Sequence, residues 1–308
     1  MKKICIVLAI LICICGFSAC NQKHKPLGAV QSFSIQEDAL EQVENKNAKV
    51  VILIGQSNAT GCSLNSYFEK NSPQEYEKAV QGYEDVLTNY CTENAGNTSD
   101  GKFVRVVPGQ GANNETFGPE VGIANALTGQ YENTTVFIIK YAWGGSVLDY
   151  QWLNGNYARG ELYKASINFI KTSLDYIKSK GYSIDLSAIC WMQGESDAFF
   201  EETYGRYYKN TKKLVEFYRK DLKGYSKTEF TFIDAGIAEI DYLWVNPTKI
   251  NDAKKKYAQG NAHCEYFSTQ ELGLTTLNEP VETPDIAHYD SMSEFELGKK
   301  FGEIILAS

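Results

Sequence analysis

The sequence has few of the residues on which several common functions depend. Its 308 residues carry 30 lysines and arginines against 38 aspartates and glutamates, a net charge of −8, with no basic block. A nucleic-acid or anionic-membrane surface is therefore not expected. Histidine is scarcer still: of the three, His24 lies in a polar N-terminal stretch, so a histidine base would have to be His263 or His288. No internal repeat or low-complexity tract is present.

Cysteine is also less informative than its number suggests. Four of the eight lie near the N terminus, and the others are Cys62, Cys91, Cys190 and Cys264. These four show no Cys-x-x-Cys spacing, so a zinc site is not expected. Whether any two of them form a disulfide or all remain buried thiols stays open.

The N terminus is typical of an exported protein. Basic residues at positions 2–3 precede an apolar run at 4–16, which is too short to span a bilayer comfortably, and small residues precede Cys20. The pattern resembles a bacterial lipoprotein signal at 1–19 with Cys20 as the lipidated residue, facing the periplasm or the cell surface. An ordinary cleaved signal is the alternative. The polar residues 20–47 suit a flexible tether, so the folded domain is expected at 48–308.

The rest of the chain alternates between strand-like and helix-like segments. Apolar β-branched runs predict strands at 50–54, 103–107, 135–142, 186–192, 230–234 and 263–267. Amphipathic spacing and capping residues predict helices at 119–131, 161–180, 204–222, 249–259 and 291–306. Such alternation is typical of βαβ units around a parallel sheet. Residues 63–101 lack sustained periodicity, and we expect an irregular insertion that faces the substrate.

The first strand ends in a turn that could carry chemistry. Gly55 stops the apolar run, Ser57 follows at the strand's carboxyl end, and Gly61 closes the turn. Open α/β sheets keep their ligand crevice at that edge, so the Ser57 hydroxyl is a candidate nucleophile. The alternative is an ordinary Ser/Asn turn that leads into a helix.

A candidate base lies near the other end of the chain. Asp285 stands three residues before His288, a spacing that lets the carboxylate accept the Nδ1 proton and leaves Nε2 to face a serine. Alone, this pair would equally suit a surface turn. His263 falls in the last predicted strand, where a packed structural role is expected.

Two further turns follow predicted strands at the same edge. Gly144 and Gly145 end the third strand, and Gln193 ends the fourth. A glycine N–H, the Gln193 side-chain amide and the Ser57 N–H could together form an oxyanion hole with three donors. Each turn taken alone would also suit the start of a helix.

Four sequence motifs together carry a family resemblance. GQSN with Gly61, AWGGS, WMQGESDA and DIAHYDSMSEFELGKKF resemble the SGNH (GDSL-type) hydrolases, above all the branch of sialate O-acetylesterases and carbohydrate esterase family six, which includes acetylxylan esterases. The resemblance implies a flavodoxin-like three-layer α/β/α sandwich with about five parallel strands and no metal or other cofactor. It assigns Ser57 as nucleophile, His288 as base and Asp285 as its partner.

The resemblance also assigns the residues around this triad. The implied oxyanion hole is formed by Ser57, Gly145 and Gln193, with Gln56, Asn58, Gly144 and Glu195 in support. For Glu195 and Asp197 we expect buried or capping carboxylates that hold the Gln193 loop rather than acids of the reaction.

The implied function is removal of O-acetyl groups from carbohydrates, either acetylated plant polysaccharide or sialic acid, through an acyl-enzyme. Twenty tyrosines and four tryptophans are compatible with stacking on sugar rings. The alternatives are another short-chain ester hydrolase, an acetyltransferase on the same fold, and an inactive glycan-binding lipoprotein.

Overall fold

The structure is a computed structural model that describes residues 26–44 and 46–308. The proposed signal, Cys20 and His24 lie outside the described residues. No helix in the described part of the chain has the length and apolar character to cross a membrane.

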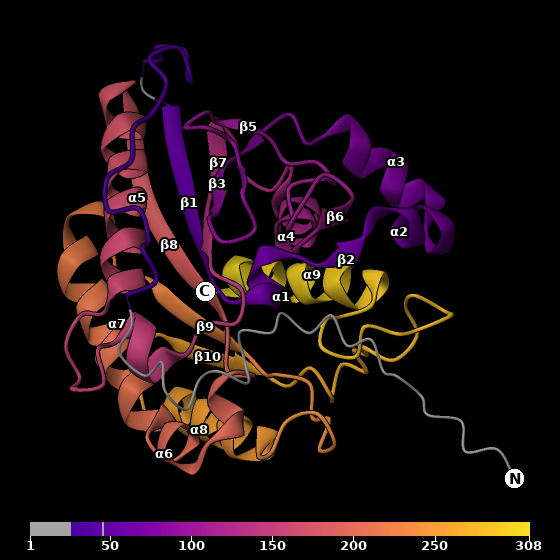
Figure 1. The fold of residues 1–308 in the computed structure, drawn as a ribbon. Coiled ribbons are helices and arrows are strands. Elements are labelled where there is room, and N and C mark those ends of the chain that lie inside the picture. The colour runs from indigo at the N-terminus through magenta and orange to yellow at the C-terminus, as the bar shows by residue number, and fades with distance from the viewer. Residues whose placement is uncertain (1–25, 45) are drawn as a thin grey trace, which may run out of the picture.

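A central sheet organises the domain (Figure 1). Its parallel strands lie in the order β10-β9-β8-β1-β7-β3. Their bounds are β1 Lys46–Gly55, β3 Val86–Thr92, β7 Thr134–Ala142, β8 Tyr182–Met192, β9 Thr231–Ala235 and β10 Cys264–Phe267. The short strands β4 (Asn97–Thr98) and β5 (Val104–Arg105) pair antiparallel with β3 and bring the sheet to eight strands. Because all six parallel strands point the same way, their carboxyl ends share one edge.

Helices cover both faces of the sheet, so the predicted three-layer sandwich is confirmed (Figure 1). One face carries α5 (Glu161–Ser179), α7 (Tyr207–Leu222) and α8 (Pro247–Gln259). The other face carries α4 (Pro119–Leu127) and α9 (Ser291–Ala307), with α2 (Asn65–Asn71) and α3 (Pro73–Gln81) beyond them. The short elements are β2 (Ser63–Leu64), β6 (Thr116–Phe117), η2 (Leu148–Trp152), η3 (Asp197–Phe199), α6 (Glu201–Tyr204) and η4 (Lys223–Tyr225).

The prediction of an irregular insertion at 63–101 is wrong. This stretch forms two helices and β3, which extends the parallel sheet beyond the expected five strands. Thr88 and Asn89 of β3 are buried polar residues, which explains the weak sequence signal. The Asn89 side chain donates to Ser173 Oγ (2.9 Å) and accepts from Ser99 Oγ (2.7 Å), so its burial leaves no amide group unpaired.

Residues 26–44 correct the predicted extent of the tether. The backbone N–H groups of Leu27 and Ala29 donate to the Glu161 carboxylate on α5, both at 2.7 Å. Farther along, the Val43 N–H donates to Lys180 O, and Leu40 is buried. This segment therefore packs along α5 as part of the domain, and β1 begins two residues before position 48.

Two predicted helices are shorter than expected for identifiable reasons. The helix expected at 119–131 ends at Leu127, because Asp85 accepts hydrogen bonds from Thr128 Oγ1 (2.5 Å) and the Gly129 N–H (2.8 Å) and turns the chain there. The helix expected at 204–222 is α7, which begins three residues later at Tyr207, because Gly205 and Arg206 separate it from the short helix α6. The four cysteines of the described domain are free thiols.

Candidate active site

The candidate residues gather at the carboxyl edge of the sheet. Six segments follow the parallel strands there, and we call them the carboxyl-edge loops: 56–62, 93–96, 143–160, 193–206, 236–246 and 268–290. Ser57 opens the single-turn helix α1 (Ser57–Thr60) directly after β1 and is half-buried. The serine turn requires glycine at position 55, because Gly55 has φ +153° and a Cβ there would lie 1.9 Å from Met192 O.

Gly144 brings the loop after β7 next to Ser57. A Cβ built on Gly144 would lie 3.7 Å from Ser57 Cβ. Asn94, from the turn after β3, fixes this loop: its Nδ2 donates to Gly144 O (3.0 Å) and its Oδ1 accepts from Gly144 N (2.9 Å). The following Gly145 is exposed, has φ +71°, and its N–H has no partner among the described residues. The sequence reasoning missed Asn94, which lies in the stretch expected to be irregular.

His288 and Asp285 form the predicted pair. Their Nδ1 and Oδ2 atoms are 2.6 Å apart, and the His288 N–H donates to Asp285 O (3.1 Å), closing a tight turn. Burial opposes charge on the ring, but the neighbouring Cys62 and Asp285 outweigh it and hold the pKa of His288 well above its ordinary value. Burial acts against Asp285 too, yet its hydrogen bond to His288 lowers the pKa of that carboxyl.

Asn58 explains how His288 is held beside the serine turn. Its Nδ2 donates to Ala287 O (3.3 Å) and its Oδ1 accepts from Tyr289 N (3.2 Å), so one side chain is hydrogen-bonded to the backbone on both sides of His288. Ser63 Oγ adds a bond to Tyr289 O (2.6 Å). The two ends of the domain are thereby joined beside Ser57, and we call these contacts the Asn58 clamp.

Cys62 is a neighbour of His288 that the sequence reasoning did not connect with the site. Its thiol is half-buried, lies 3.7 Å from Ser57 O, and is close enough to the His288 ring to raise the pKa of that ring. Within residues 46–308 no hydrogen bond joins the Ser57 hydroxyl to His288. Catalytic hydrogen bonds are often loose before substrate binds, so this spacing does not oppose the assigned roles.

The Gln193 side chain is placed differently from the expectation. It is fully buried, and its Nε2 donates to Asp197 Oδ2 (2.6 Å) and Ser146 O (2.9 Å), which uses both amide hydrogens. Its Oε1 accepts from Tyr207 Oη (3.0 Å). In this arrangement the amide ties the loop after β8 to the loop after β7. Within the described part of the chain, the N–H groups of Ser57 and Gly145 lie near the Ser57 side chain without a partner.

Gln56 and two buried acidic residues of the 193–206 loop complete this scaffold. Gln56 Oε1 accepts from the Gly194 N–H at 3.2 Å. Glu195 Oε1 accepts from Asn58 Nδ2 at 2.7 Å, and burial raises the pKa of this carboxyl. Asp197 accepts from the Leu148 N–H (2.8 Å), and burial raises its pKa to about 7. Both carboxylates are therefore buried and join the 193–206 loop to neighbouring carboxyl-edge loops.

A buried ion pair stabilises the backbone at the end of α1. Lys140 Nζ of β7 lies 2.7 Å from Glu120 Oε2 and 2.9 Å from Gln110 O, with both charged side chains fully buried. Glu120 Oε1 also accepts from the Gly118 N–H (3.0 Å), and Gly118 packs directly on Gly61 at the end of α1. The pair thus anchors the backbone on which the serine turn ends.

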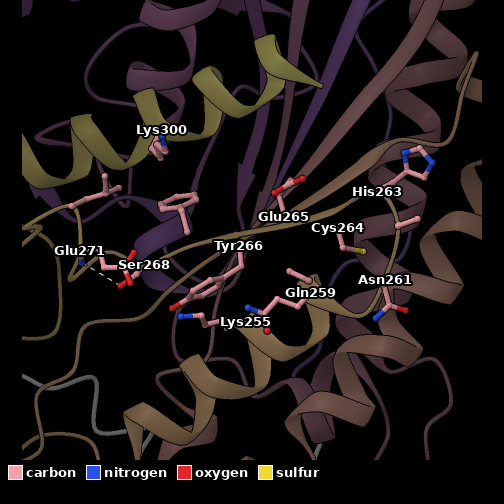
Figure 2. Close-up of a pocket in the computed structure, with 14 residues that line it drawn as sticks. Lys255, Gln259, Asn261, His263, Cys264, Glu265, Tyr266, Ser268, Glu271 and Lys300 are labelled. Carbon is pink, nitrogen blue, oxygen red and sulfur yellow. Dashed lines mark hydrogen bonds between the residues drawn. The ribbon is translucent and has the colours of Figure 1, made fainter.

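The other candidate histidine lies elsewhere. His263 is exposed in a left-handed turn (φ +52°) before β10, so the expected packed role is wrong. It lines a surface hollow of about 770 Å³ together with Lys255, Tyr266 and Lys300 (Figure 2). Neither Ser57 nor His288 lines this hollow. Among the described residues no cluster of His, Cys, Asp and Glu could hold a metal ion.

The fold and these residues define the chain as a hydrolase-type α/β/α sandwich with a candidate Ser-His-Asp triad. The family model "carbohydrate esterase, sialic acid-specific acetylesterase" matches residues 47–307. The chain therefore belongs to this family of carbohydrate esterases, and the resemblance to sialate O-acetylesterases is confirmed. No curated protein matches the chain.

Solved structures agree on the fold. A protein from Arabidopsis thaliana is similar with a TM-score of 0.62 and 19% identity over 85% of this chain and 99% of that one. NanS is similar with a TM-score of 0.62 and 18% identity over 86% and 98%. A carbohydrate acetylesterase from Xanthomonas citri is similar with a TM-score of 0.55 and 13% identity over 82% of this chain and 55% of that one.

Proposed function

We propose that the protein is a serine esterase that releases acetate from O-acetylated carbohydrates through an acetyl-enzyme. The observation that carries the proposal is the Asn58 clamp, which holds a His-Asp pair beside a serine at a strand's carboxyl end. Family membership supplies the reaction class, because the matching family is one of carbohydrate esterases. The structure supplies the residues that could perform it.

In the proposed reaction, His288 Nε2 removes the Ser57 hydroxyl proton as Oγ attacks the acetyl carbonyl carbon. The tetrahedral intermediate collapses, the sugar oxygen leaves with the proton from His288, and the acetyl group stays on Ser57. Water then attacks with His288 again as base, and acetate departs while Oγ recovers its proton. Asp285 keeps the ring oriented and stabilises its charged form, as the 2.6 Å contact requires.

The oxyanion would be held by the Ser57 and Gly145 N–H groups, because both lie at the site without a partner. The predicted third donor, Gln193, could reach the oxyanion only by giving up Ser146 O or Asp197. We therefore propose that it chiefly positions the neighbouring loops. Removing one oxyanion donor typically lowers the rate by ~10²–10³, whereas a positioning role also predicts a loss of thermal stability.

The test is acetate release from p-nitrophenyl acetate, p-nitrophenyl butyrate, acetylated xylan and O-acetylated sialic acid. Ser57→Ala should lower turnover by ~10³-fold or more while the melting temperature is kept. The matched control is Ser187→Ala on β8. Among the described residues, the Ser187 hydroxyl donates one hydrogen bond, to Asp185 O (3.2 Å). Unchanged turnover in Ser57→Ala would overturn the assignment, and transfer of acetyl to sugar without free acetate would indicate an acetyltransferase.

We also propose export and lipid anchoring through Cys20, supported by the signal-like residues that precede it. Expression in a bacterium with radiolabelled palmitate should label the wild type and leave Cys20→Ala unlabelled. A labelled Cys20→Ala variant, or an unlabelled wild type in the soluble fraction, would contradict the anchor.

A further inference from the structure

We infer that the substrate of this site is an uncharged O-acetylated sugar and that the site disfavours sialic acid, which carries a carboxylate. The inference rests on the proposed esterase function and specifies its substrate class. It follows from two features of the carboxyl-edge loops: their charge and the apolar surface that they expose.

The carboxyl-edge loops are strongly acidic. Together they carry thirteen aspartates and glutamates, two arginines and no lysine. Several of the carboxylates are exposed, among them Glu201, Glu239, Asp241 and Glu282. A substrate approaching this edge meets a negative field, which slows and weakens the binding of an anion.

Neither arginine is available to a ligand carboxylate. Arg206 forms an ion pair with Asp149 and also donates to Glu202 O (3.1 Å) and Gly155 O (3.3 Å). Arg159 is held by Asp221 through Nε (3.1 Å) and NH2 (2.9 Å). Because carboxylates are usually recognised by a paired fork of guanidinium donors, the loops lack the group that sialic acid would need.

The same edge exposes an apolar surface that suits an uncharged ring. Phe200 is 42% exposed on the loop after β8, and Tyr242 (75%) and Val245 (61%) are exposed on the loop after β9. Phe199 packs edge-to-face on the buried Trp244, with ring centroids 5.2 Å apart, and the Asn246 N–H donates to Ala198 O (3.1 Å). These contacts join the two loops, and we call their exposed aromatic residues the aromatic rim.

The loop after β8 connects the aromatic rim to the candidate site along the chain. This loop begins at Gln193 and Gly194, which contact Gln56 directly before Ser57, and it reaches Phe200 six residues later. Aromatic side chains with one polar end are well suited to the C–H face and hydroxyl edge of a pyranose. A neutral acetylated glycan could therefore lie on the rim with an acetyl group at Ser57.

The experiment compares two substrate pairs that differ at a single carboxylate: 9-O-acetylated sialic acid against its C1 carboxamide, and an O-acetylated methyl glucoside against the corresponding glucuronide, in which a carboxylate replaces the C6 hydroxymethyl group. We expect kcat/KM for acetate release to be about tenfold higher for each neutral partner at about 10 mM salt, and about two- to threefold higher at about 150 mM salt. Equal or better hydrolysis of the acids at low salt would overturn the inference.

Two variants separate the electrostatic and apolar parts. Asp241→Lys should reduce the neutral-to-acid ratio at low salt by about twofold, whereas the control Glu77→Lys, on the exposed face of α3, should leave it unchanged. Tyr242→Ala should raise KM for the neutral sugars at least threefold, and by a larger factor than it raises KM for p-nitrophenyl acetate. No change in either variant would refute the corresponding part.

Failure of this inference and failure of the proposed function give different results. If p-nitrophenyl acetate is hydrolysed in a Ser57-dependent manner but the acids are preferred, the esterase stands and the neutral-substrate inference falls. If no acetate is released from any ester, the proposed function itself is wrong.

Discussion

Replacing Asn58 with alanine would test the central structural claim, that His288 is held in place from the serine turn. The variant loses the bond to Ala287 O, the bond from Tyr289 N and the 2.7 Å bond to Glu195. Two neutral hydrogen bonds contribute ~1 kcal/mol each, and the bond to a carboxylate contributes ~1.5–3 kcal/mol. We therefore expect the free energy of unfolding to fall by ~3.5–5 kcal/mol, because the buried Glu195 also loses its amide partner.

The effect on catalysis should be separable from the effect on stability. Without the clamp, the turn that carries His288 is free to move by about 1 Å, and a displacement of that size costs ~10² in rate. The assay is kcat for p-nitrophenyl acetate at a temperature where denaturant titration shows the variant fully folded. The matched control is Asn168→Ala on the exposed face of α5, which should change stability by less than ~0.5 kcal/mol and leave kcat unchanged.

The outcome that refutes this reasoning is a folded Asn58→Ala variant with kcat within about threefold of wild type. That result would mean that the contacts of α9 and its preceding loop position His288 without Asn58. A normal melting temperature together with reduced kcat would instead refute the stability estimate and leave the positioning role standing.

Three further predictions follow from the same geometry. Because a general base must be neutral, activity should rise with pH through the raised pKa of His288. Cys62→Ala removes one cause of that raised pKa, so the pH–rate profile of this variant should shift to lower pH. An unchanged profile would show that Cys62 does not affect the His288 pKa. Lys140→Met should cost ~3–5 kcal/mol in urea unfolding, because it leaves Glu120 buried without its cation; a loss below ~1 kcal/mol would show that water reaches the pair. Gly55→Ala should lose more than ~3 kcal/mol, since its Cβ would lie 1.9 Å from a backbone oxygen of β8, and a soluble variant with unchanged melting temperature would contradict this packing.

Local sequence patterns predicted the main strands and helices well. The run at 50–54 is fully buried in β1, and the helix expected at 161–180 is α5, one residue shorter. These predictions succeed because the burial of side chains follows a regular pattern along a buried strand or an amphipathic helix, and the apolar residues in the sequence follow the same pattern. The failure at β3 has the matching cause: the buried polar residues Thr88 and Asn89 interrupt the apolar run, so no periodic apolar pattern marks the strand. The partner of the Asn89 amide, Ser173, lies far away in the sequence.

For the candidate site, too, part could be predicted from local sequence and part depends on tertiary structure. The sequence by itself indicated the candidate residues, because a serine after a strand-ending glycine and an Asp-x-x-His turn are local motifs. Only the tertiary structure decided how they are supported. The grip of Asn58 on His288, the thiol of Cys62 beside the ring and the use of both Gln193 amide hydrogens within the protein all join segments far apart in sequence.

The charge of the site depends on both the sequence and the tertiary structure. Composition showed an acidic chain, but only the parallel order of the strands collects the acidic loops at one edge and leaves the two arginines there paired with aspartates. A parallel sheet brings the ends of strands that are far apart in sequence to one side, so a property spread along the chain becomes a local field. The sequence therefore determined which chemical groups are present, and the tertiary structure decided which of them lie together at the carboxyl edge of the sheet.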